Sequence, residues 1–117
     1  MNETQSILNL VVETCEDRKA EHCIVLDMQQ LTPIADYFVI CHGNNERQVQ
    51  AITRAIKDTL EENGHGVKRI EGFDQARWVL IDLGPVICHV FHKDERSYYN
   101  LERLWGDAAL IEVEDMK

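Results

Sequence analysis

The sequence predicts a single mixed α/β domain, in which helices pack on one mixed sheet of five strands. Segments with apolar residues at helical spacing alternate with short β-branched and aliphatic runs, in the order α-β-β-α-β-β-β-α. The 117 residues are enough for one core, and no repeat, linker or low-complexity segment divides them. We therefore expect one domain over residues 1–107, followed by a short acidic tail at 108–117.

The N-terminal half predicts two helices and two strands. Residues 2–20 form an amphipathic helix, because apolar residues recur there at helical spacing: Ile7, Leu8, Val11, Val12 and Cys15. Residues 22–28 and 36–42 are rich in β-branched and aliphatic side chains and predict strands that are buried on both faces. A second helix follows Gly43 and ends at Gly64, which supplies a left-handed cap.

The C-terminal half predicts three further strands and one helix. The strands cover residues 67–72, 76–83 and 85–92, with a tight turn at Gly84 and Pro85 between the last two. Residues 94–105 show helical spacing of apolar and aromatic side chains, typical of a helix that packs on a sheet.

The turn at residues 43–45 lies between a strand and a helix, an arrangement that favours phosphate binding because the first N–H groups of a helix are unpaired. A nucleotidyl or phosphoryl transferase also needs neighbouring carboxylates to hold Mg²⁺. No strand of this sequence carries such a pair, since Asp82 stands alone before Gly84. The sequence therefore favours a binding protein over an enzyme, without a cofactor.

The charge of the chain restricts its partners. Twelve Lys and Arg residues against 21 Asp and Glu residues give a formal net charge of −9, which repels nucleic acid and anionic lipid. The same field attracts a basic partner. No apolar run is long enough to cross a membrane and no basic segment precedes an apolar one at the N-terminus, so we expect a cytoplasmic protein, or an organellar one whose targeting segment has been removed.

Three of the four cysteines stand next to a histidine, as in a zinc site: Cys23, Cys41 and Cys88. Neighbouring residues of a strand point to opposite faces, however, so the two side chains of such a pair cannot bind the same metal ion. We interpret the cysteines as small buried side chains and expect no metal site.

The fourth and fifth strands suggest a partner-binding face. Alternation places Trp78, Leu80 and Asp82 on one side of the fourth strand, and His89 and Phe91 on one side of the fifth. Such a surface is aromatic and apolar with two polar groups, like the centre of a protein interface. Arg96 and Tyr99 would lie at its edge. The alternative, equally supported by the pattern, is that helices cover this face and Trp78 is a core residue.

Asp36 and Tyr37 open the second strand, and we expect both to be structural. A carboxylate at the start of a buried strand usually fixes neighbouring backbone or an arginine.

Several ordered blocks of the sequence together resemble the Iojap-like family, the ribosomal silencing factors. These blocks are residues 31–44, 48–49, 71–72, 78–84, 89–91 and 96–105. The likeness runs from about Ile7 to Asp107, nearly the whole chain. It implies a nucleotidyltransferase-like fold without the active site of those enzymes, in agreement with the missing carboxylates.

The resemblance also implies a function. Family members bind the large ribosomal subunit through ribosomal protein fourteen, block its association with the small subunit and so repress translation. An alternative is a nucleotide-binding protein or small nucleotidyltransferase, motivated by the turn at Gly43. A third hypothesis is a homodimer of the free protein, in which the face with Trp78 contacts a second copy.

Overall fold

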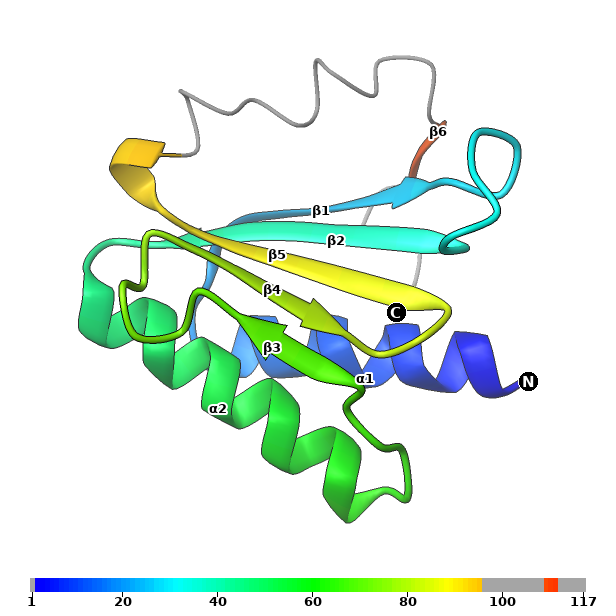
Figure 1. Ribbon diagram of the computed structural model, residues 1–117, viewed down its shortest axis with the longest axis horizontal. Helices are drawn as coiled ribbons and strands as arrows, with labels where there is room; N and C mark the ends of the chain where they lie inside the picture. The colour runs from blue at the N-terminus through cyan, green and yellow to red at the C-terminus, as the bar shows by residue number, and fades with distance from the viewer. Residues whose placement is uncertain (1, 96–108, 112–117) are drawn as a thin grey trace.

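The computed structural model describes residues 2–95 and 109–111 and has the predicted mixed α/β fold (Figure 1). The elements in chain order are α1 (Glu3–Asp17), β1 (Glu21–Asp27), β2 (Tyr37–Gly43), α2 (Glu46–Glu62), β3 (Arg69–Glu71), β4 (Trp78–Asp82), β5 (Val86–His92) and β6 (Ala109–Ile111). All five strands expected from the sequence are present. None of the described helices is long and apolar enough to cross a membrane.

The sheet is mixed, with the strand order β3-β4-β5-β2-β1-β6. Strands β2 and β5 are parallel, and the other neighbours are antiparallel. The sheet has one strand more than the sequence predicts, because β6 pairs with β1 at the edge. β6 lies in the segment that we assigned to the acidic tail, and its three residues are too few to show a strand period.

Helices α1 and α2 lie on the same face of the sheet, below it in Figure 1. Both begin at asparagine caps, since the side chain of Asn2 accepts a hydrogen bond from Gln5 N and that of Asn45 accepts one from Gln48 N. α2 ends as expected before Gly64, whose φ of +82° is left-handed. Their apolar sides and one face of the sheet form the larger core cluster, and we call this side of the sheet the helix-covered face.

The opposite side of the sheet carries a second cluster, which we call the second face. It consists of Ile24, Leu26, Phe38, Ile40, Trp78, Leu80, Asp82, Ile87, His89 and Phe91. The strand registers place these residues together, since Trp78 pairs with Phe91, and Leu80 with His89. The alternation inferred from the sequence is therefore confirmed.

Two sequence predictions need comment. β1 is not buried on both faces, because its first residues are exposed where the register with β2 shifts and His22 has a φ of +46°. Residues 93–95 begin a helical turn, but most of the helix predicted at 94–105 falls outside the described residues.

Candidate functional site

The second face brings together five of the seven residues that the sequence singled out. Trp78, Leu80 and Asp82 come from β4, and His89 and Phe91 come from the neighbouring strand β5. Arg96 and Tyr99 lie outside the described residues. Whether the second face binds a partner remains a prediction, and the geometry of its centre determines which side chains could do so.

A hydrogen bond joins the two most distinctive side chains of this face. Trp78 Nε1 donates to His89 Nδ1 over 3.1 Å. The indole ring is also stacked on Phe91, with 5.2 Å between ring centroids, and the His89 ring meets Phe38 edge-on at 4.9 Å. The centre of the second face is thus a packed aromatic cluster with one internal polar contact.

His89 is neutral in this cluster. Burial lowers the pKa of its imidazole to about 4, because charge is disfavoured away from water. Since Nδ1 accepts from Trp78, the proton of the neutral ring lies on Nε2. That Nε2 is buried and has no hydrogen-bond partner within the described part of the chain.

Asp82 lies at the end of β4, where it has two structural contacts. Its Oδ1 accepts a hydrogen bond from Gly84 N over 2.9 Å, which stabilises the turn into β5. Its Oδ2 lies 3.6 Å from Nε of Arg69, on the adjacent strand β3. The carboxylate is 21% exposed and keeps some access to solvent.

The burial of this face corrects one part of the sequence prediction. We expected all five side chains to be available to a partner, yet His89 is only 5% exposed and Phe91 is fully buried. Both support the face from within. Trp78 itself is half-buried, so it is not the core residue of the alternative that we left open. Trp78, Leu80 and Asp82 are half-buried and form the accessible part of the cluster.

The turn after β2, suggested as a phosphate site, has a different structural role. A Cβ atom at Gly43 would lie 3.0 Å from Val49 N, so the glycine permits close packing of the strand against α2. Asn44 N donates to the side chain of Gln48, and Gln48 N donates to Asn45. Side chains of the chain itself therefore occupy N–H groups that a phosphate would need.

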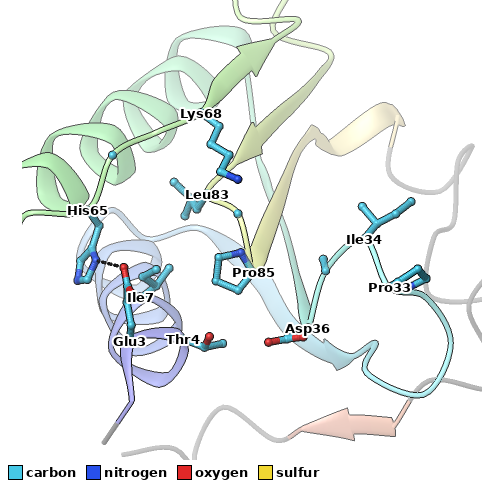
Figure 2. Close-up of a pocket in the computed structure, with 13 residues that line it drawn as sticks. Glu3, Thr4, Ile7, Pro33, Ile34, Asp36, His65, Lys68, Leu83 and Pro85 are labelled. Carbon is cyan, nitrogen blue, oxygen red and sulfur yellow. Dashed lines mark ion pairs between the residues drawn. The ribbon is translucent and has the colours of Figure 1, made fainter.

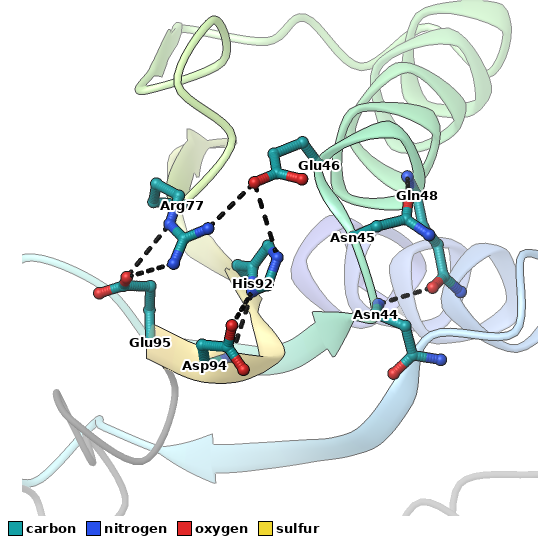
Figure 3. Close-up of polar contacts among 8 residues, drawn as sticks. All are labelled: Asn44, Asn45, Glu46, Gln48, Arg77, His92, Asp94 and Glu95. Atoms are coloured by element: carbon teal, nitrogen blue, oxygen red, sulfur yellow. Dashed lines mark hydrogen bonds and ion pairs between the residues drawn. The ribbon is translucent and has the colours of Figure 1, made fainter.

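Charge at the same end of the sheet also opposes an anion (Figure 3). Arg77 donates to Glu46 over 3.0 Å and to Glu95 over 2.7 Å, and this cation is thus already paired. The backbone N–H of Glu46 and the Arg77 guanidinium lower the pKa of the Glu46 carboxyl. His92 lies 3.7 Å from both Glu46 and Asp94, which adds a third carboxylate.

The four cysteines gather in the helix-side core rather than on a metal. Sγ of Cys15 and Sγ of Cys41 are 4.0 Å apart. Hydrogen bonding with the thiols of Cys23 and Cys41 raises the pKa of Cys15, and burial raises that of Cys88. Within the described residues no group of three or more His, Cys, Asp or Glu side chains could hold a metal ion.

Comparison with known proteins decides the family. A family-wide sequence model described as "Ribosomal silencing factor during starvation" matches residues 1–117. The chain belongs to the ribosomal silencing factor family. It is 60% identical to the ribosomal silencing factor of Bacillus subtilis over 110 residues, which cover 94% of this chain and 93% of that one. The Iojap protein of maize chloroplasts is 28% identical over 103 residues, which cover 88% of this chain and 45% of the maize protein.

Solved structures of relatives have the same fold. A Bacillus halodurans protein has a TM-score of 0.83 and 53% identity, and the match covers 92% of this chain and 98% of that one. A Chromobacterium violaceum protein has a TM-score of 0.87 and 36% identity, covering 90% of this chain and 88% of that one. Ribosomal silencing factors are regulatory proteins, and the expected family is thus confirmed.

Sequence reasoning missed one contact of this silencing factor, and of its two expectations for the start of β2 one holds and one does not. The Trp78–His89 hydrogen bond depends on the register of β4 against β5, which alternation alone does not fix. The role of Tyr37 was expected to be structural, and its hydroxyl accepts from both Gln5 and Gln29. No hydrogen bond or ion pair joins the Asp36 carboxylate to the described residues, contrary to expectation, although the Asp36 backbone bonds to Pro85 and Met28.

Proposed function

We propose that this protein binds the large ribosomal subunit through ribosomal protein fourteen, blocks association with the small subunit and thereby represses translation. The observation that carries the proposal is the second face, combined with membership of the ribosomal silencing factor family. Blocking subunit association requires a body docked at the subunit interface and no chemical step.

The accessible part of the second face has the composition of an interface centre. Trp78 and Leu80 offer apolar surface, and Asp82 adds a carboxylate beside them. Aromatic anchors supported by buried neighbours usually carry most of the energy of such contacts. The buried ring of Phe91 holds the indole of Trp78 in place, which reduces the entropy that binding would cost.

The overall charge supports a protein partner rather than RNA. A formal charge of −9 opposes direct, non-specific binding to the phosphate backbone. It favours capture of a basic protein surface, and Asp82 would face that surface directly. A cytoplasmic location, where ribosomes assemble and work, belongs to the same proposal.

The rival function, nucleotide binding or nucleotidyl transfer, has little support at its expected site. Glu46, Asp94 and Glu95 surround the turn after β2, and Arg77 is paired with two of them. A triphosphate would meet net negative charge there. Titration with ATP and Mg²⁺ distinguishes the two functions. If the protein binds ATP and the Arg77→Gln variant does not, the result would favour the rival function.

The free protein could also hide the second face in a homodimer. Size measurement with and without large subunits tests this arrangement. A dimer that dissociates when large subunits are added agrees with the proposed function, whereas a dimer that persists on them favours a scaffold.

The direct test of the proposed function is a two-step sedimentation experiment. Purified large subunits are incubated with the protein, and small subunits are then added before the mixture is separated. We expect the protein to sediment with large subunits and the fraction of joined ribosomes to fall. Absence of binding, or binding with no loss of joined ribosomes, would contradict the proposal.

A further inference from the structure

A cavity lies at the opposite end of β2 from the turn after that strand, near the start of the strand (Figure 2). It has a volume of about 440 Å³, within the range of small-molecule sites. Four segments build it: the first turn of α1, the loop before β2, the segment after α2 and the turn between β4 and β5. The lining is largely polar, and Ile34 and Pro85 add apolar surface to it, whereas Ile7 and Leu83 are almost fully buried.

Two side chains of opposite charge border this cavity and have no partner in the part of the chain that the structure describes. Neither Asp36 nor Lys68 forms a hydrogen bond or ion pair with the described residues. Asp36 is half-buried, a position in which an unpaired carboxylate is costly, and Lys68 is exposed. Among the described cations, Lys57, Arg69 and Arg77 are paired with carboxylates, whereas Lys19 and Lys93, like Lys68, form no ion pair with the described residues.

The two charged groups lie on different sides of the cavity. In Figure 2 the Asp36 carboxylate points toward Thr4, while the Lys68 ammonium lies above Pro85. The aliphatic part of Lys68 passes over Gly84, 3.4 Å from where a Cβ would stand. A third side holds Glu3 and His65, whose Oε1 and Nδ1 are 3.6 Å apart.

We propose that this cavity binds a free α-amino acid with an apolar side chain. The ligand carboxylate would pair with Lys68, its ammonium with Asp36, and its side chain would contact Ile34 and Pro85. Two carboxylates, Glu3 and Asp36, face one lysine, so the cavity is net negative and disfavours phosphates and dicarboxylates. The inference is independent of ribosome binding and of the second face.

The charge requirement can be tested with matched ligands. Leucine, methionine and phenylalanine are titrated into the full-length protein at up to millimolar concentration and followed by calorimetry. N-acetylleucine lacks the ammonium charge, and leucinamide lacks the carboxylate. We expect at least one of the three amino acids to bind and to raise the melting temperature, and both leucine analogues to bind at least about tenfold more weakly than leucine.

Variants then locate the binding site. Asp36→Asn and Lys68→Met should each weaken amino-acid binding at least about tenfold, because each removes one charge of the pair. Lys57→Met removes an exposed lysine on α2 and should leave binding unchanged. Melting curves establish that each variant is folded. Absence of binding by all three amino acids, equal binding of the analogues, or unchanged binding in both cavity variants would overturn the proposal.

Discussion

The two faces of the sheet differ in the kinds of side chain that they carry. The helix-covered face is mainly aliphatic, with several cysteines, and its buried side chains pack against α1 and α2. The second face contains an indole, an imidazole, two phenyl rings and a carboxylate, with a buried N–H of His89 that lacks a partner in the described residues. The aromatic rings stabilise this second layer as they pack, but the buried N–H of His89 costs stability, which a binding role for this face would explain.

The largest effect should come from the helix-covered face. Ile56 on α2 is fully buried, and Ile56→Ala removes its methyl and methylene groups from a closely packed layer. We expect a loss of about 3 kcal/mol in the free energy of unfolding, measured with denaturant. Ile34→Ala is the matched control, because Ile34 is 73% exposed and should change stability by less than about 0.5 kcal/mol. Equal effects would contradict this account of the core.

The second face should respond to pH through His89. Its pKa is about 4 in the folded protein and near 6.5 when exposed, so the unfolded chain binds more protons between these values. The contribution of neutral His89 to the free energy of unfolding is therefore fully present above pH 6.5, and it decreases as the pH falls toward 4. The total loss should approach about 3 kcal/mol.

A variant isolates this contribution from that of the carboxylates. His89→Gln cannot gain a proton in this range but can still accept from Trp78. We expect the free energy of unfolding to depend less steeply on pH in the variant than in the parent protein. Parallel curves between pH 6.5 and 4 would mean that His89 is not held neutral by burial.

A smaller effect should follow from the hydrogen bond within this face. Trp78→Phe keeps an aromatic ring against Phe91 but leaves His89 Nδ1 without its donor. We expect a cost of about 1–2 kcal/mol in unfolding free energy. In a His89→Phe background the same change should cost clearly less, since the acceptor is already gone. Equal costs in both backgrounds would show that the Trp78–His89 hydrogen bond does not contribute to stability.

The sequence predicted which residues share a face of the sheet better than it predicted how deeply each of them is buried. Period-two alternation correctly separated Trp78 and Leu80 from Val79 and Ile81, because it is a local property of a strand. It could not predict that Phe91 is fully buried, since burial depends on contacts distant in the sequence. The strand β6 was missed because three residues carry no period, and the cavity near Asp36 because four separate segments build it.

The most direct test of the central claim compares the second face with exposed positions outside it in ribosome binding. Leu80→Ala with Asp82→Asn removes apolar surface and charge from the second face, and the amide can still accept from Gly84 N. The matched control is Leu31→Ala with Glu61→Gln, which makes the same chemical changes at an exposed leucine and at an exposed carboxylate on α2.

Both double variants are first checked by melting curves, and their affinity for purified large subunits is then measured by sedimentation. We expect the Leu80 and Asp82 variant to bind at least about tenfold more weakly and to stop blocking subunit association, with little change in the control. Unchanged binding by a folded Leu80 and Asp82 variant would show that the second face is not where this protein meets the ribosome.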